Sequence, residues 1–182
     1  MIIAITGTPG TGKTSISKGL IKKGFNVIDL NKIAYEKKYL LGKDEKRNSF
    51  IIDTNKLDIY IKKNYKTKEL IFIEGHLSHL LNCVDIVIIL RLNPSKLKNN
   101  LLKRKWKKEK INENLEAEIL DIILCETIQL HSPDKVMEID TSENSLNETI
   151  KIIINLVENN FKNIKKYKIG KIDWSKHILK EF

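Results

Sequence analysis

The chain has few of the features that stabilise secreted or membrane-embedded proteins. Its 182 residues include only two cysteines, Cys83 and Cys125, and each lies in an apolar stretch. Two cysteines so placed do not make a disulfide framework, so we expect both to be buried free thiols. No apolar run is long enough to cross a bilayer, and the apolar start leads into a glycine-rich loop rather than a signal-peptide cleavage site. We therefore expect a cytoplasmic protein without membrane contact.

Zinc-ligand spacing, internal repeats and low-complexity linkers are also missing from the sequence. The histidines and cysteines that lie closest together, His76, His79 and Cys83, do not have the spacing of a zinc site, so we predict no structural metal. A length of 182 residues, with 41% hydrophobic and 31% charged residues, is typical of one globular domain. We expect a single domain over residues 1–182.

Acidic residues are in deficit. The chain has 33 Lys and Arg against 23 Asp and Glu, a net charge of +10. Such an excess is typical of proteins that contact nucleic acid, because lysine and arginine neutralise phosphates. The same charge also arises where lysines only solvate the surface and attract nucleotides, so composition leaves both interpretations open.

The clearest motif is the segment 7–14, which reads GTPGTGKT. It lies between an apolar run and a helix-like segment, which is the order of a phosphate-binding loop and not of a chance surface turn. Its glycines let backbone N–H groups point at a phosphate, and the helix N-terminus adds its positive end. Lys13 can then reach the β- and γ-phosphates, and the Thr14 hydroxyl can hold Mg²⁺. The motif predicts ATP and Mg²⁺ as ligands.

Five apolar runs predict the strands of a parallel sheet, and helical segments separate them: 1–6, 25–29, 70–74, 84–90 and 136–140. Near-continuous apolar runs of this kind indicate an α/β fold with helices on both faces of the sheet. Ligands of such sheets bind beyond the carboxyl ends of the strands. This rule places 7–14, 74–76, Arg91 and Asp140 along one edge.

The segments between the strands predict further elements. We expect a helix over 31–40, a polar stretch without periodicity over 42–49, and one long amphipathic helix over 112–130. Ser145 and Glu148 predict a capping box that opens the last long helix. The tail from about residue 162 is basic and less regular.

Two residues at the end of the run 70–74 are candidates for catalysis. Glu74 has the position of the second Walker acid, where it can hold Mg²⁺ or its water; the alternative is a residue that caps a neighbouring helix. His76 follows closely enough to orient a water or a substrate phosphate, and the alternative is a loop histidine bonded to backbone.

The basic segment 103–110 is a candidate lid. Phosphoryl transfer depends on charge neutralisation and alignment, so Arg104 can bridge the transferred phosphate when a lid closes. Two alternatives stay open: a solvated helix face, or an RNA contact in which Trp106 stacks on a base.

Taken together, the loop 7–14, Glu-Gly-His at 74–76, Arg-Lys-Trp at 104–106 and the run 110–120 resemble the adenylate kinase isoenzyme 6 family, above all its archaeal branch. The similarity also takes in 44–49 and 170–174, so it spans nearly the whole chain. It implies a P-loop NTPase fold like that of nucleoside monophosphate kinases, with a five-stranded parallel sheet flanked by helices. The nucleoside monophosphate (NMP)-binding segment would lie near 29–52 and a short lid near 103–113.

The resemblance also implies a function. It implies the reaction ATP + AMP ⇌ 2 ADP with Mg²⁺, an ATPase side activity and a part in maturing the small ribosomal subunit. The partners would be AMP or another nucleoside monophosphate, a ribosomal protein of the small-subunit platform, and rRNA through the ribosomal precursor. Residues that would contact ATP are Gly10, Thr11, Gly12, Lys13, Thr14, Ser15 and Arg104. Lys13, His76 and Arg104 would be catalytic, and Thr14 and Glu74 would hold the metal.

The chain departs from the family pattern at two positions. Tyr35 stands where many members carry an arginine, so the acceptor phosphate would depend on Arg47, Lys46 or Arg91 instead. Lys105 replaces the glycine that commonly follows the lid arginine, and a residue other than glycine restricts the backbone there. A second hypothesis is therefore an ATP-driven assembly factor whose kinase activity is incidental. A third, a kinase for another small metabolite, is disfavoured by the NMP-binding segment.

Overall fold

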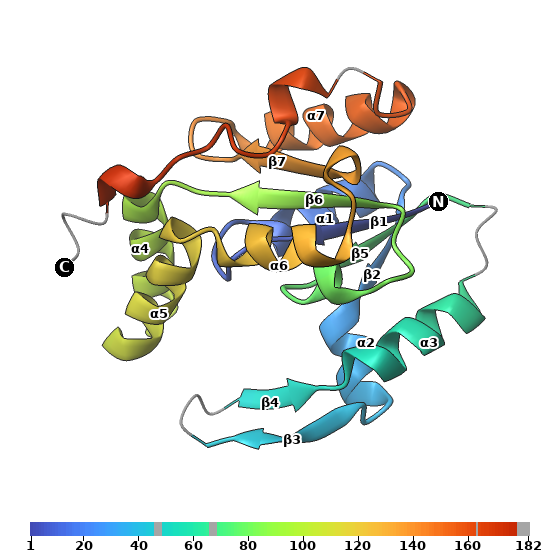
Figure 1. Cartoon of the computed structure of the whole chain (residues 1–182), viewed down its shortest axis with the longest axis horizontal. Helices are drawn as coiled ribbons and strands as arrows, with labels where there is room; N and C mark the ends of the chain where they lie inside the picture. Colours follow the sequence, from blue (N-terminus) through green and yellow to red (C-terminus); the bar gives the residue numbers. More distant parts are fainter. Residues whose placement is uncertain (46–48, 66–68, 163, 178–182) are drawn as a thin grey trace.

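A computed structural model describes residues 1–45, 49–65, 69–162 and 164–177. Its centre is a sheet of five strands: β1 (Ile2–Thr6), β2 (Asn26–Asp29), β5 (Ile71–Glu74), β6 (Ile86–Arg91) and β7 (Val136–Asp140). The strand order is β2-β5-β1-β6-β7, and every neighbouring pair is parallel (Figure 1). The five predicted strands and the α/β fold are thus confirmed.

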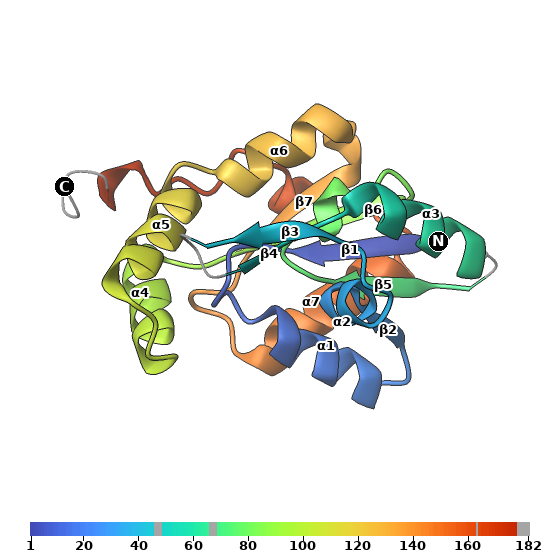
Figure 2. The same cartoon turned by 90° about the horizontal axis from the view of Figure 1, so that it is seen from below.

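Helices cover both faces of this sheet, because successive side chains of a strand point to opposite sides. Ile3 and Ile5 of β1 pack in the same cluster as α1 (Lys13–Lys22) and α7 (Leu146–Glu158). Ile2 and Ala4 lie in the opposite cluster. That cluster contains residues of α2 (Leu30–Glu36), α3 (Thr54–Asn64) and α6 (Ile122–Leu130). Figure 2 shows α1 and α6 on opposite sides of the strands.

Two excursions leave the central layers (Figure 1). One is a helical hairpin of α4 (Pro94–Lys103) and α5 (Lys108–Ile119), which follows the carboxyl end of β6. It contains the segment 103–113 that was predicted as a lid, and we use the name lid for the whole hairpin. It has a small apolar core of its own, made by Leu92, Leu97, Leu101, Ile111 and Leu115. The other is an antiparallel pair, β3 (Leu40–Asp44) and β4 (Ser49–Ile52).

The β3–β4 pair corrects the prediction of an irregular polar stretch over 42–49. Leu40 begins β3 and does not end a helix, since α2 stops at Glu36. Most of the side chains on both strands are exposed or half-buried, so neither strand shows the alternation that a buried face imposes. Lys46 and Arg47, two of the residues considered for the acceptor phosphate, lie outside the described residues.

The single helix predicted over 112–130 is wrong, because the structure has two helices there. α5 ends at Ile119 and α6 begins at Ile122, with Asp121 between them at φ +55°. The Asp121 carboxylate accepts a hydrogen bond from buried Arg91, which holds the chain in this left-handed turn. A contact 30 residues away in sequence therefore breaks a helix that local periodicity favours.

The helix cap at α7 and the cysteines were also predicted from the sequence. The Ser145–Glu148 capping box is present at the start of α7. Both cysteines are free thiols, but Cys125 is exposed on α6, contrary to the prediction, and Cys83 is half-buried. No helix within the described ranges has the length and apolarity needed to span a membrane.

The basic tail runs along the edge strand β7. Lys168 forms a bridge with Met137, and the Gly170 N–H donates to the Glu138 carboxylate at 2.8 Å. Short 3-10 turns at Lys165–Tyr167 and Ser175–His177 follow the bends of this segment. The tail therefore covers part of an edge that would otherwise be open.

Candidate functional site

The loop between β1 and α1 adopts a conformation that only glycine accepts easily. Gly7, Gly10 and Gly12 have φ values of +137°, +106° and +101°. A Cβ atom at Gly7 would lie 2.4 Å from the Leu90 carbonyl oxygen, and one at Gly10 would lie 2.8 Å from Leu97 Cδ1. The loop thus depends on glycine both for its turns and for its close packing on β6 and the lid.

A pocket of about 170 Å³ opens over this loop at the carboxyl edge of the sheet. The loop, α2, the end of β5 and the lid all contribute to it. Its lining residues are Pro9, Gly10, Gly12, Lys13, Thr14, Ser15, Asn31, Glu74, His76 and Arg104. Of the residues predicted to contact ATP, to hold the metal or to act in catalysis, Thr11 alone is not among them; it is buried, and its hydroxyl donates to the Thr8 carbonyl at 2.9 Å.

Asn31 and Pro9 were not predicted, although Asn31 carries a readable signal. It stands in the first turn of α2, directly after the carboxyl end of β2, where parallel sheets bind ligands. Asp29 fixes the start of this helix by accepting from the Lys32 N–H at 3.0 Å. Asn31 therefore brings α2, an element separate from the lid, into the lining of the pocket.

Lys13 is buried and folded back onto its own loop. Its Nζ donates to the carbonyl oxygens of Gly7 at 2.6 Å and Thr8 at 3.1 Å. Burial lowers the pKa of Lys13 to about 8; the nearby Glu74 carboxylate opposes this change, and Arg104 adds to it. The protein alone thus compensates the positive charge of Lys13 poorly, and an anion bound in the pocket would stabilise the protonated form of its amine.

Glu74 ends β5 and is 7% exposed. Burial raises the pKa of its carboxyl group, whereas Lys13 and a hydrogen bond from Thr14 lower it. A carboxylate next to a hydroxyl is a pair of hard oxygen ligands, which fits Mg²⁺. Within the described ranges no cluster of three His, Cys, Asp or Glu residues can hold a metal.

His76 lies two residues beyond the end of β5 and lines the same pocket. Burial lowers the pKa of its imidazole to about 4, and the positive charge of Lys13 acts in the same direction. The loop that carries it is tied to β1, because the Thr6 hydroxyl donates to the His76 carbonyl at 3.3 Å. At neutral pH the imidazole is therefore uncharged, and in this form it can accept a hydrogen bond through one ring nitrogen and donate one through the other.

Arg104 reaches the pocket from the C-terminal end of α4. Its guanidinium carbon lies 5.5 Å from the centre of the Trp106 ring, and Lys110 Nζ lies 4.5 Å from the same centre. Trp106 itself packs against the apolar core of the lid. This placement favours a packing role for Trp106 over the base-stacking alternative.

Arg91 does not serve the acceptor phosphate as expected, because it is 2% exposed and surrounded by acids. Its Nε donates to Glu118 Oε1 at 2.8 Å, and its other nitrogens bond to Glu138 and Asp121. Burial opposes its charge, but these carboxylates raise its pKa above the usual value. Arg91 is a structural cation.

The same network reaches the phosphate loop through Glu118. The Thr8 hydroxyl donates to Glu118 Oε2 at 2.5 Å, and both side chains are buried. Asn100 of α4 adds a second link, because its Nδ2 donates to the Gly10 carbonyl at 3.0 Å. The two lid helices are thus bonded directly to the loop.

Tyr35 lies one helical turn after Asn31 and is exposed. Its ring meets that of Phe50 on β4 edge to face, with 5.9 Å between the centres. An exposed aromatic pair therefore joins α2 to the β3–β4 hairpin.

Comparisons with known proteins agree with this geometry. A family model described as an AAA domain matches residues 3–121. The "Putative adenylate kinase" of Methanocaldococcus jannaschii is 42% identical over 176 residues, which covers 96% of this chain and 93% of the relative. The protein of the same name from Archaeoglobus fulgidus is 41% identical over 174 residues, covering 96% and 92%.

Solved structures share the fold at low sequence identity. A shikimate kinase from Acinetobacter baumannii, in complex with shikimate, has a TM-score of 0.61 and 16% identity, and the match covers 89% of this chain and 95% of that one. A deoxyadenosine kinase from M. mycoides with bound dATP has a TM-score of 0.53 and 22% identity, covering 87% and 99%. These likenesses establish an architecture shared with P-loop kinases.

Proposed function

Because this chain belongs to the family of archaeal P-loop proteins named "Putative adenylate kinase", we propose that it is a Mg²⁺-dependent adenylate kinase of the isoenzyme 6 type. It would convert ATP and AMP to two ADP and hydrolyse ATP slowly when no acceptor is bound. The observation that carries the proposal is the shared pocket, in which Lys13, Glu74, His76 and Arg104 meet over the phosphate loop.

The loop and Lys13 would bind the phosphates of ATP. The pocket is lined by Gly12, Lys13, Thr14 and Ser15 at the start of α1, where the positive end of the helix dipole would attract a phosphate. A bound β- or γ-phosphate would draw Lys13 Nζ away from the carbonyls of Gly7 and Thr8. The negative charge of the phosphate would also raise the pKa of Lys13 and keep its amine protonated. Thr14 and Glu74 would hold Mg²⁺, which neutralises phosphate charge when bound.

Arg104 and His76 would complete the transfer. In the step itself the bond between the γ-phosphorus and the bridging oxygen of ATP breaks, and a bond to an oxygen of the AMP phosphate forms, with no covalent enzyme intermediate. Arg104, on the lid, would neutralise the moving group. His76, uncharged at neutral pH, would orient the acceptor, or accept a proton when water replaces AMP.

The test is ADP production from ATP and Mg²⁺ with AMP absent, with AMP present, and with other nucleoside monophosphates. We expect AMP to raise ADP formation far above the hydrolysis background. Lys13→Ala should reduce turnover by roughly a hundredfold or more, since it removes the phosphate-binding cation. Lys18→Ala, an exposed position on the same helix, should leave turnover unchanged. Equal turnover in both variants would refute the proposed site.

A second candidate function is an ATP-driven assembly factor for the small ribosomal subunit, with rRNA nearby. It is favoured by the net charge of +10 and by the tail, in which residues 162–177 contain six lysines and one aspartate. This function requires a stable complex with a ribosomal protein of the subunit platform and hydrolysis of ATP stimulated by that protein. If the ribosomal protein does not bind at low salt and ADP formation depends on AMP, the assembly-factor function is refuted and the kinase function is the one supported.

A further inference from the structure

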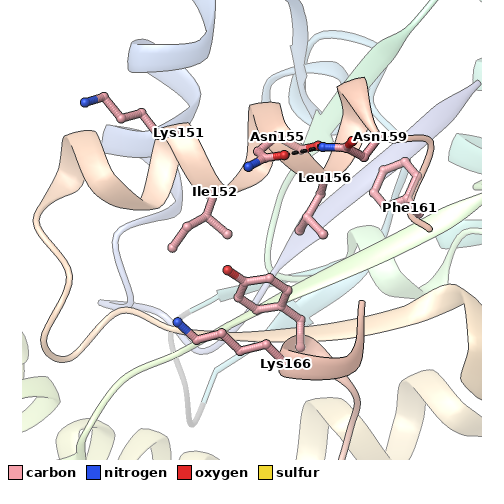
Figure 3. A pocket seen from close by; sticks show the side chains of 8 residues that line it. Lys151, Ile152, Asn155, Leu156, Asn159, Phe161 and Lys166 are labelled. Carbon is pink, nitrogen blue, oxygen red and sulfur yellow. Dashed lines mark hydrogen bonds between the residues drawn. The ribbon is translucent and has the colours of Figure 1, made fainter. Parts of the chain in front are cut away.

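A second pocket, of about 420 Å³, lies between α7 and the tail segment that follows it (Figure 3). It shares no lining residue with the pocket over the phosphate loop. Its volume falls within the ~300–1,000 Å³ typical of small-molecule sites. Nothing in the proposed kinase reaction uses it.

The lining of this pocket is amphipathic and carries positive charge at one end. Ile152 and Leu156 of α7 form an apolar wall, and Tyr167 of the tail also lines the pocket. In Figure 3 the ammonium groups of Lys151 and Lys166 lie toward the same end of the pocket. No acidic side chain lines it within the described ranges. The pocket therefore complements an anion attached to a flat, partly apolar body.

Phe161 closes the other end of the pocket from a strained position. Its φ is +56°, and Asn160 before it has φ +48°. The left-handed conformation costs a bulky residue on the order of 1 kcal/mol, so contacts with the surrounding structure must hold Phe161 in it. The Phe161 N–H donates to the Leu156 carbonyl at 2.8 Å, which fixes the turn that brings the ring to the pocket.

Amide side chains distinguish this pocket from a lipid or simple hydrophobic site. Asn155 and Asn159 line it from α7 and are hydrogen-bonded to each other, as Figure 3 shows. Amides can pair with the polar edges of a nucleobase, aromatic rings can stack on its face, and ammonium groups bind phosphate.

From this juxtaposition we propose that the pocket between α7 and the tail binds a nucleoside phosphate, with its phosphate between Lys151 and Lys166 and its base toward Tyr167 and Phe161. The ligand is either a free nucleotide or one residue of single-stranded RNA, since both present the same chemistry. Further lysines flank the site on the tail, at positions 162, 165 and 168, and would meet neighbouring phosphates of a strand.

The test measures binding of a fluorescein-labelled uridylate decamer to the full chain by anisotropy, at about 50 mM salt. We expect the double variant Lys151→Ala/Lys166→Ala to weaken binding about tenfold. The matched control Lys22→Ala/Lys23→Ala removes the same charge at the exposed end of α1, outside the pocket and away from the flanking lysines of the tail, and should weaken binding about twofold or less. Tyr167→Leu should weaken it about fivefold or more without any change of charge. AMP-dependent ADP formation should persist in all of them.

A second arm identifies the source of the ligand. AMP is added as competitor to the wild type and to Lys13→Ala, in which the phosphate loop is impaired. If AMP displaces the decamer equally from both proteins, free nucleotide enters this pocket. If the decamer binds and AMP does not displace it, the natural ligand is a residue of single-stranded RNA. Equal losses in the two lysine pairs, no effect of Tyr167→Leu, or no binding of either probe would overturn the proposal.

Discussion

Lys105 occupies a backbone conformation that favours glycine. It follows the last residues of α4 at φ +56°, and its N–H donates to the Leu102 carbonyl at 2.9 Å, as in the common helix end that uses glycine. We expect Lys105→Gly to raise the free energy of unfolding by about 0.5–1 kcal/mol, because the strain disappears. Urea denaturation measures this change.

A neighbouring lysine provides the control for this prediction. Lys103→Gly replaces the same residue type within α4, where φ is helical, and should lower the free energy of unfolding by about 0.5 kcal/mol. If both variants are destabilised alike, the strain assigned to Lys105 is absent. The lid then tolerates lysine at this position without cost.

His76 should make the protein sensitive to acid. Its pKa is lowered to about 4 in the folded protein, against 6.5 for an ordinary histidine, so the unfolded chain binds the proton more tightly. Between these values stability therefore falls as the pH falls. The wild type should lose up to about 3 kcal/mol of its free energy of unfolding between pH 6.5 and 4 through this histidine, and we expect His76→Asn to abolish that loss.

Denaturation at several pH values, on the wild type and His76→Asn, checks the prediction. His177→Asn is a matched control on the tail, away from the phosphate pocket. Parallel stability curves for the wild type and His76→Asn would show that the imidazole is not held uncharged by its site.

At the scale of elements, the bond between Thr8 and Glu118 is one of two hydrogen bonds that join the lid to the phosphate loop. The Thr8 hydroxyl bonds to Glu118 of α5, and the Thr8 carbonyl receives Lys13 Nζ. We expect Thr8→Val to lower the free energy of unfolding by about 1–3 kcal/mol, since it leaves a buried carboxylate oxygen without its donor. The Kd for ATP should also rise, by about tenfold, because the loop loses its anchor.

Thr8→Ser keeps the hydroxyl and should retain nearly the wild-type Kd, as measured by calorimetric titration with a non-hydrolysable ATP analogue. A Thr8→Val protein that is less stable but binds ATP with the wild-type Kd would contradict the anchoring role. The bond would then serve the fold alone.

The elements differ in how well local sequence predicts them. The strands β1, β5, β6 and β7 could be predicted because nearly all of their residues are buried, so their apolar runs are nearly continuous. The edge strand β2 buries only Ile28, and its apolar run is shorter. The strands β3 and β4 could not be predicted in this way, because their side chains are exposed or half-buried and the two strands pair with each other outside the central sheet. The break at Asp121 also escapes prediction, since Arg91 enforces it from another element.

The site shows the same division. The glycine-rich loop with Lys13 and Thr14 is a local motif, and the carboxyl-end rule adds Glu74 and His76. Arg91 has the same sequence position relative to its strand as Glu74, and it was expected to face a ligand. Its burial among acids depends on residues 27 to 47 positions away, which no local pattern reveals.

At the scale of the whole molecule, Arg91 joins parts that are distant in sequence. It connects β6 to β7 through Glu138, to the lid through Glu118 and to the start of α6 through Asp121, and Glu138 in turn receives the tail at Gly170. Removing this cation would leave buried carboxylates uncompensated. We expect Arg91→Met to lower the free energy of unfolding by about 3–5 kcal/mol in denaturant titrations.

Two further variants separate this network from ordinary charge effects. Arg91→Lys keeps the charge but loses the planar group that reaches three carboxylates, so its cost should be smaller than that of Arg91→Met yet clearly measurable. Lys96→Met breaks the exposed pair with Glu143 and should cost less than about 1 kcal/mol. A cost for Arg91→Met as small as that of Lys96→Met would mean that the sheet, the lid and the tail are held together by apolar packing alone.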